Sequence, residues 1–182
     1  MVGLSLLFLL GYVVPQFSAM YESLDADLPW FSTFVLGLGE FVRAWWIVIL
    51  ALPWAAAEAA VRYLGDLAGQ TVVDCMNPIG RTAAGMGLTL GHTTSGGEIV
   101  QDWLPRAHVV KTLNQVGAEI MADTARLPHR PVMFMAGNDT DAKGKVGLML
   151  TDLGFEALDA GDITKARLLE PFGMVWINQA LM

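Results

Sequence analysis

The chain has 182 residues, 54% of them hydrophobic and 16% charged, and its formal net charge at pH 7 is −7. A nucleic-acid binder needs a clustered basic face to neutralise phosphates, and no such cluster occurs, so we expect no nucleic-acid partner. The single cysteine, Cys75, excludes a disulfide within the chain and fits a reducing compartment, which indicates a cytoplasmic location. The high hydrophobic share indicates an unusually buried core or a membrane-facing part.

The N-terminal part of the chain is rich in apolar runs. Val2–Val14 and Ala44–Ala57 are nearly continuous, but Pro15 and Pro53 interrupt them before the roughly 20 residues that a membrane-spanning helix needs. No Lys or Arg precedes the first run, so a secretory signal fits poorly. We expect residues 1–45 to form a helical, membrane-protein-like extension that packs on its own chain or contacts a membrane surface.

After this extension, short apolar runs alternate with helix-like segments, which is typical of an α/β protein with a parallel sheet. Trp46–Leu52 is apolar and rich in β-branched residues, as expected for a strand that is covered on both faces, and Pro53 ends it. Trp54–Leu67 is rich in alanine and predicts a helix, with Gly69 just beyond its end. Thr71–Cys75 then predicts a second strand.

The stretch Met76–Gly97 holds six glycines, and we expect an irregular loop there that lines a ligand site. The later elements follow in the same alternation. We expect a helix at Ser95–Trp103, strands at His108–Leu113, Pro131–Ala136 and Glu156–Asp159, a helix at Thr140–Leu153, and a final apolar helix at Ile163–Met182 that is interrupted near Pro171.

Seven sequence blocks follow one another from Ile47 to the end of the chain: ILALPW, VVDCMNP, GHTTSGGE, VVKTLN, PVMFMAG, DLGFEALDAG and ARLLEP. This succession resembles the NADP-dependent reductases of the deazaflavin-coenzyme oxidoreductase family. The resemblance implies a Rossmann-type parallel sheet and an enzyme that moves a hydride between NADP and a deazaflavin or, in relatives, another small acceptor.

The resemblance also implies which residues contact the cofactor. The cofactor-binding residues would be Pro53, Trp54, Asn77, Pro78, His92, Thr93, Thr94, Ser95, Lys111 and Asn114. The first two would flank the dinucleotide, the next two would lie near the nicotinamide, the 92–95 segment would offer helix-N-terminal amides to an anion, and the last two would close the far side. Simpler structural roles stay open: a strand stop at Pro53, a turn at Asn77, and a helix cap at Thr94 or Ser95.

Hydride transfer requires close stacking and exclusion of water more than an acid or a base, so no catalytic side chain is predicted. The three histidines, at positions 92, 108 and 129, lack metal-ligand spacing, and we expect no metal site.

The glycine-rich phosphate-binding motif of such enzymes has no credible match in the sequence. GLGEFV, beginning at Gly37, has Val42 where glycine or alanine is required, and GMGLTL, beginning at Gly85, has Leu90 there. The family's basic residues after the second strand, which recognise the NADP phosphate, are missing as well. We therefore expect a partial Rossmann-like sheet that lacks its first βαβ half, and weak or no NADP binding by this chain alone.

A second resemblance concerns the N-terminal part. The segment YVVPQFSAMYESLDADLPWFSTFVLGLGEFVRAWW is similar to the inner-membrane platform protein of type II secretion and type IV pilus systems, carried by Pro15, Tyr21–Glu22, Leu28–Pro29 and Phe41–Trp46. The two resemblances together predict a fusion or truncated product, with a membrane-protein-like extension at 1–45 and the C-terminal part of a reductase domain at 46–182. The alternatives are a membrane-associated secretion component and a non-catalytic interaction domain.

Two further expectations concern exposed surfaces. In the doubly wound strand order 3-2-1-4-5-6, the strand Trp46–Leu52 should lie beside a first strand that this chain does not have, which leaves its edge open. The final helix is more apolar than a solvent-facing helix would be, and relatives use this region in subunit contacts. We therefore expect a homodimer through the C-terminal helix.

Overall fold

The computed structural model describes residues 47–83 and 85–181. The chain divides into two units, Met1–Ile47 and Val48–Met182, and nearly all described residues belong to the second. The helical extension expected at 1–45 and the GLGEFV segment at Gly37 lie outside the described residues.

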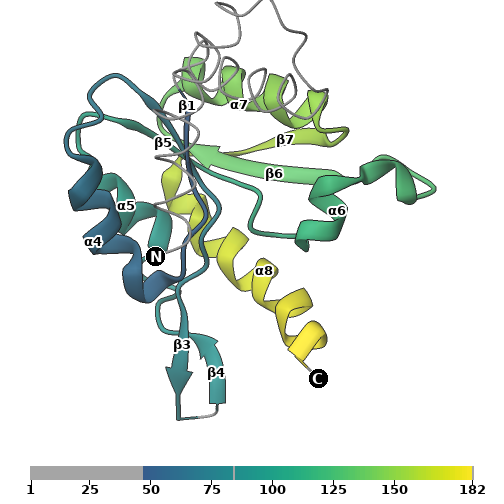
Figure 1. Cartoon of the computed structure of the whole chain (residues 1–182), viewed down its shortest axis with the longest axis horizontal. Coiled ribbons are helices and arrows are strands. Elements are labelled where there is room, and N and C mark those ends of the chain that lie inside the picture. Colours follow the sequence, from purple (N-terminus) through teal and green to yellow (C-terminus); the bar gives the residue numbers. More distant parts are fainter. Residues whose placement is uncertain (1–46, 84, 182) are drawn as a thin grey trace, which may run out of the picture. The chain divides into compact units, whose positions relative to one another are not determined.

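A five-stranded sheet with strand order β1-β2-β5-β6-β7 forms the centre of the second unit (Figure 1). The strands are β1 (Ile47–Leu50), β2 (Thr71–Asp74), β5 (His108–Lys111), β6 (Val132–Gly137) and β7 (Glu156–Gly161). The predicted Rossmann-like α/β fold is confirmed. Among the described residues β1 is an edge strand, as expected for Trp46–Leu52.

The strand pairs of the sheet whose register is described include an antiparallel one, which the sequence patterns did not reveal. β2 pairs with β5 in parallel and β6 with β7 in parallel, but β5 and β6 are antiparallel, with Val110 opposite Gly137. Parallel neighbours need a crossover connection, usually a full helix. The connection from β5 to β6 carries only the five-residue α6 (Ala118–Ala122) and the short 3-10 helix η2 (Thr124–Arg126), so the chain returns in the opposite direction.

Four longer helices pack on the sheet. They are α4 (Trp54–Leu64), α5 (Gly96–Trp103), α7 (Thr140–Asp152) and α8 (Ala166–Leu181), and the 3-10 helix η3 (Ile163–Lys165) precedes the last. Helix α4 ends before the predicted Leu67 because Gly65 takes a φ of 74°. Helix α8 runs through Pro171, where an interruption was expected. No helix in the described part of the chain is long and apolar enough to cross a bilayer.

The glycine-rich stretch Met76–Gly97 contains a hairpin where the sequence predicted an irregular loop. Strands β3 (Ile79–Thr82) and β4 (Gly85–Leu88) pair antiparallel and project away from the main sheet (Figure 1). The GMGLTL segment is therefore strand β4 and the two residues that follow it. Gly80 has no room for a side chain, because a Cβ there would lie 2.6 Å from Thr89 Cγ2.

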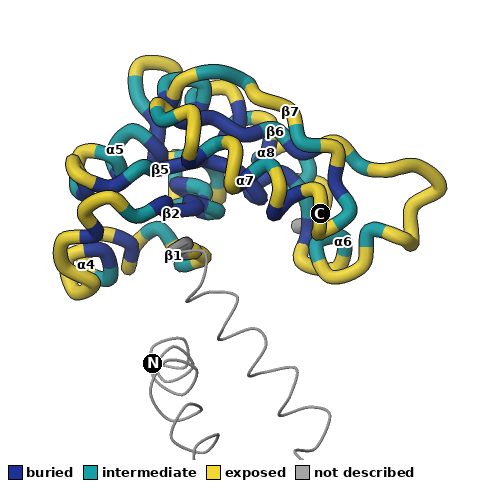
Figure 2. Tube along the Cα trace, turned by 90° about the horizontal axis from the view of Figure 1, so that it is seen from above, coloured by how far each residue is buried: buried dark blue, intermediate teal, exposed yellow. Residues whose placement is uncertain are grey.

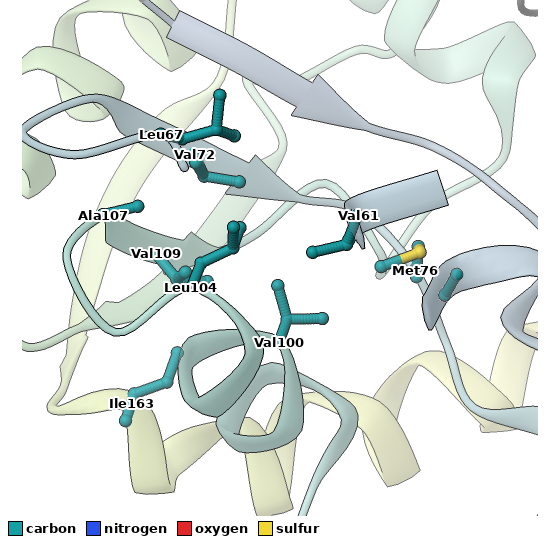
Figure 3. Packing of buried hydrophobic residues seen from close by; sticks show 10 residues of the cluster. Val61, Leu67, Val72, Met76, Val100, Leu104, Ala107, Val109 and Ile163 are labelled. Carbon is teal, nitrogen blue, oxygen red and sulfur yellow. The ribbon is translucent and has the colours of Figure 1, made fainter. Parts of the chain in front are cut away.

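The core lies between the sheet and the helices α4 and α5. Val72 of β2 and Val109 of β5 point toward Val61 of α4 and Val100 of α5, and Ile163 closes the cluster (Figure 3). Successive strand residues face opposite sides of a sheet. Asp74 and Lys111 therefore share the α5 face with Val72 and Val109. Figure 2 shows β2 and β5 buried along their lengths, while the segment after α6 is exposed.

Candidate functional site

Two asparagines meet where the parallel strands β2 and β5 end. The Asn77 amide nitrogen donates to the backbone carbonyl of Asn114 at 3.0 Å, and the Asn114 amide nitrogen donates to Asn77 Oδ1, also at 3.0 Å. The Asn114 amide donates in addition to the carbonyl of Leu169 on α8 at 3.0 Å. Open α/β sheets bind ligands beyond the carboxyl ends of their parallel strands, and this amide pair occupies that place.

The backbone around the amide pair is constrained from two sides. Leu113 has a φ of 57°, in the left-handed region that a branched residue rarely adopts, and this turn directs Asn114 toward Asn77. On α8, Gly173 approaches so closely that a Cβ there would lie 2.6 Å from the Asn114 carbonyl and 3.3 Å from Asn77 Oδ1. Helix α8 therefore packs its backbone directly against the pair.

Gln115 fixes Asn114 to the neighbouring strand. Its amide nitrogen donates to Asn114 Oδ1 at 3.1 Å and to the Phe134 carbonyl at 2.9 Å, while its Oε1 accepts from the Phe134 N–H at 3.1 Å. Gln115 is buried, and these bonds satisfy its amide. The amide pair thus belongs to a polar network that extends from β2 to β6.

Lys111 lies beneath this network and is fully buried. Its ammonium is 3.0 Å from Asp74 Oδ2 and 3.0 Å from Glu170 Oε1, and it also donates to the Met76 carbonyl. Asp74 in turn accepts from the Met76 N–H at 2.8 Å. The side chain that was expected to close a pocket therefore points into a buried ion cluster, where it supports the strand ends from within.

The charges in this cluster stabilise one another. Burial alone would lower the pKa of Lys111, but the attraction of Asp74 and Glu170 and their hydrogen bonds outweigh burial and raise that pKa above its usual value. Lys111 is therefore an ammonium at neutral pH. The neighbouring Cys75 thiol has its pKa raised by burial to about 12, which leaves it protonated and unreactive.

The N-terminus of α5 is occupied by protein groups. Glu170 accepts from the N–H groups of Gly96 and Gly97 at 2.9 and 3.0 Å. Ser95 Oγ accepts from the Glu98 N–H at 3.2 Å, which caps the helix, and it donates to Glu98 Oε2 at 2.7 Å. The simpler role considered for Ser95, a helix cap, is the one that the geometry supports.

The residues before this cap line the approach to α5. His92 and Thr93 are exposed, and Thr94 is half-buried. His92 has a φ of 59°, in the left-handed region. All three stay predicted contacts of a ligand, although Glu170 already accepts from the N–H groups of Gly96 and Gly97 at the helix start.

Besides Asn77, the predicted site residues that follow β1 and β2 are Pro53, Trp54 and Pro78, and each has a structural role. Pro53 precedes the first residue of α4, and Trp54 stacks on Trp103 of α5 with ring centroids 5.6 Å apart. Pro78 is buried, and its carbonyl accepts from the N–H and the hydroxyl of Thr89 at 2.8 and 2.9 Å, which ties the base of the hairpin to the amide pair.

Trp176 is one turn of α8 beyond Gly173 and therefore lies on the helix face that meets the amide pair. Its indole N–H is buried and has no hydrogen-bond partner within the described residues. An unsatisfied buried donor costs about 1–3 kcal/mol, so it is the kind of group that a ligand acceptor would satisfy.

Four residues of this region were not predicted as site residues from the sequence: Asp74, Gln115, Glu170 and Trp176. A carboxylate directly after the apolar run TVV, and a glutamate within the apolar run LLEPF, are the signals that could have indicated buried charges. Nothing in the sequence shows that the two carboxylates share one lysine, because the pairs span 37 residues and more.

Glu98 and Arg167 tie α5 to α8 through hydrogen bonds of 2.6 and 2.8 Å. The hydrogen bond from Arg167 holds the pKa of Glu98 below its usual value of 4.5. A carboxyl with a lowered folded-state pKa contributes stability above its unfolded pKa and loses it as the pH falls through the folded value. We expect the urea concentration at the unfolding midpoint to decrease as the pH is lowered below 4.5. The decrease should be smaller in Arg167→Met. Arg126→Met, which removes an exposed ion pair with Asp123, should leave the profile unchanged. Superimposable profiles for Arg167→Met and the unmodified chain would contradict this.

An open depression of about 470 Å³ lies at the opposite end of β5. His108 and Asp139 both line it, with His108 Nδ1 3.4 Å from Asp139 Oδ2. None of the predicted site residues lines it, so it is separate from the amide pair. Over residues 47–83 and 85–181, no group of three or more metal-ligating side chains is arranged to hold an ion.

Comparison with known proteins gives two separate similarities. No protein-family model matches the chain. The N-terminal region is similar to the type II secretion system protein F of Xanthomonas campestris pv. campestris, with 64% identity over 52 residues, which cover 29% of this chain and 13% of that protein.

The remainder is similar to reductases. The crystal structure of a putative F420-dependent NADP reductase from Arthrobacter sp. FB24 matches with a TM-score of 0.69 and 38% identity, over 74% of this chain and 64% of that one. The rat protein Metalloreductase STEAP3 is 32% identical over 105 residues, 58% of this chain and 20% of its own length. The chain thus spans less than two thirds of each of these proteins. Both resemblances seen in the sequence are confirmed: a Rossmann-like fold similar to that of NADP-dependent reductases, preceded by a region similar to a secretion-system protein.

Proposed function

We propose that residues 47–182 carry the nicotinamide-facing part of an NADP-dependent hydride-transfer site. The observation that carries the proposal is the Asn77–Asn114 amide pair at the ends of adjacent parallel strands, in a fold similar to that of a putative NADP reductase. A reduced nicotinamide supplies the hydride when it is bound. The acceptor is a deazaflavin or another small molecule that stacks against it.

The residues around the pair fit the nicotinamide end of such a cofactor. The orphaned Trp176 N–H offers a donor to a carboxamide oxygen. Buried Pro78 and the close approach of Gly173 exclude water from the strand ends. A dry and rigid floor is what hydride transfer needs, because the reaction depends on the stacking distance and not on proton exchange. Lys111 and Gln115 hold this floor in place.

The phosphate end of the cofactor has weaker support. At the start of α5, Glu170 already engages the amides that would otherwise favour an anion, and Lys111 is paired with two carboxylates. The sequence also lacks the glycine-rich phosphate-binding turn. Weak binding of the whole dinucleotide by this chain follows from these features.

Fragments of the cofactor test the assignment. Nicotinamide mononucleotide, at millimolar concentration, should shift the side-chain amide NMR signals of Asn77 and Asn114, whereas adenosine 2′,5′-diphosphate should not. Trp176→Phe should weaken the mononucleotide shift severalfold, and Leu148→Ala, at an exposed position of α7 outside the site, should not. Shifts from the adenosine fragment alone would refute the nicotinamide assignment, and shifts from neither fragment would favour a non-catalytic interaction domain.

We also propose that α8 mediates a homodimer. Leu168, Phe172 and Val175 are 67%, 55% and 66% exposed and lie at helical spacing on one face of α8. An apolar stripe of this kind is typical of a helix that meets a partner. We expect Leu168→Glu to convert a dimer to a monomer in sedimentation velocity, and Leu148→Glu, on the exposed face of α7, to leave it dimeric. A clean monomer at high concentration of the unmodified chain would refute the dimer.

A second candidate role rests on the N-terminal similarity to the type II secretion system protein F. We propose that this region brings the chain to a membrane surface. Flotation of the full chain with liposomes should recover it in the lipid fraction. Membrane fractionation of cells that express the chain provides a second measurement. Recovery in the soluble fraction alone, in both experiments, would contradict this role.

A further inference from the structure

The Glu170 carboxylate joins three elements. Its Oε1 lies 3.0 Å from Lys111 Nζ and accepts from Gly97 N–H at 3.0 Å, while Oε2 accepts from Gly96 N–H at 2.9 Å. The carboxylate is thus bound by β5 and by the start of α5, and it belongs to α8. A side chain at position 96 would be tightly packed, because a Cβ there would lie 3.0 Å from Glu170 Oε1.

The buried charges around Glu170 alternate in sign through space. Asp74 is followed by the Lys111 ammonium, then by Glu170, and then by the positive end of the α5 dipole. A buried charge without its partner is strongly destabilising, so each member needs the next. Helix α8 cannot slide or rotate without leaving the Glu170 carboxylate and two helix amides unpaired in the core, and the Lys111 ammonium with Asp74 as its one remaining carboxylate partner.

The same turn of α8 contacts the amide pair. The carbonyl of Leu169, the residue before Glu170, accepts from the Asn114 amide at 3.0 Å. Gly173, three residues after Glu170, meets the Asn114 carbonyl and Asn77 Oδ1. The position of the carboxylate therefore determines the position of the groups that orient the amides.

We propose that Glu170 is a positioning residue: its carboxylate is the internal anion of the α5 N-terminus, and through this bond and the bond to Lys111 it sets the orientation of the Asn77–Asn114 amide pair. The positioning of the pair stands on the contacts above. Its consequence for a nicotinamide ligand rests on the proposed function.

The test restores, as a small molecule in solution, the part of the Glu170 side chain that a substitution by alanine removes. Glu170→Ala deletes one methylene and the carboxylate, which together correspond to acetate. In the full chain, this variant should lose about 10 °C in Tm and shift the side-chain amide signals of Asn77 and Asn114. Added sodium acetate should restore both the Tm and the amide signals toward those of the unmodified chain. Acetamide, its neutral isostere, and sodium chloride at the same ionic strength should not.

Two further variants make the test decisive. Glu170→Gln keeps the shape but not the charge, and we expect it to shift the amide signals without recovery in acetate, since the glutamine fills the site. Glu156→Ala, at an exposed position of β7, should respond to none of the additives. If Glu170→Ala does not fold, acetate should raise its refolding yield where acetamide does not.

Unchanged amide signals in Glu170→Ala, or equal recovery in acetate and acetamide, would overturn the proposal. These measurements use no nicotinamide ligand, so they are independent of the proposed function. Acetate rescue without any effect of nicotinamide mononucleotide would retain the positioning role of Glu170 and reject the ligand assignment.

Discussion

Lys111→Met is expected to lower the free energy of unfolding by about 3–5 kcal/mol, because it leaves the carboxylates of Asp74 and Glu170 buried without their shared cation. Lys111 is fully buried, so solvent cannot replace the lost ammonium. Urea denaturation followed by circular dichroism measures the change.

The matched control is Lys145→Met on α7, which removes an exposed ammonium and should change the free energy of unfolding by less than about 0.5 kcal/mol. The double variant Lys111→Met/Glu170→Gln should recover part of the loss, since it removes one of the two uncompensated carboxylates. Equal stability of Lys111→Met and the unmodified chain would show that the ion cluster does not hold the strand ends.

Gly173→Ala is expected to push α8 away from the amide pair. The added Cβ would lie 2.6 Å from the Asn114 carbonyl, which is backbone and cannot turn aside. Overpacking of this kind costs about 1–3 kcal/mol. The side-chain amide signals of Asn77 and Asn114 should move, and any response to nicotinamide mononucleotide should be lost.

Gly144→Ala on α7 provides the opposite case, because a Cβ there meets nothing within 4 Å. Alanine is favoured over glycine in a helix interior, so this variant should be more stable by about 0.5–1 kcal/mol with unchanged amide signals. A Gly173→Ala protein as stable as Gly144→Ala would contradict the close approach of α8.

The order and type of most elements could be predicted from the sequence. The runs Thr71–Cys75 and His108–Leu113 became buried parallel strands because their apolar residues suit a sheet that is covered on both faces. The direction of β6 could not be predicted, since an apolar strand reads the same either way. The β3–β4 hairpin was missed because its strands have four residues each and contain glycines typical of loops.

The sequence predicted those site residues that directly follow a strand. Asn77 and Asn114 each follow a predicted strand, and the two strands proved to be parallel neighbours, which brings the amides together. The environment of Lys111 depends on partners that are distant in sequence. The two carboxylates that pair with its ammonium come from β2 and α8, and only the tertiary fold shows these ion pairs.

We propose that the described unit presents a nicotinamide-facing floor and does not hold the phosphates of the dinucleotide tightly. Calorimetric titration of the purified full chain with NADPH measures how tightly the dinucleotide is held. We expect a dissociation constant for NADPH well above the micromolar range, and a dissociation constant of comparable size for nicotinamide mononucleotide. A micromolar dissociation constant for NADPH would contradict it.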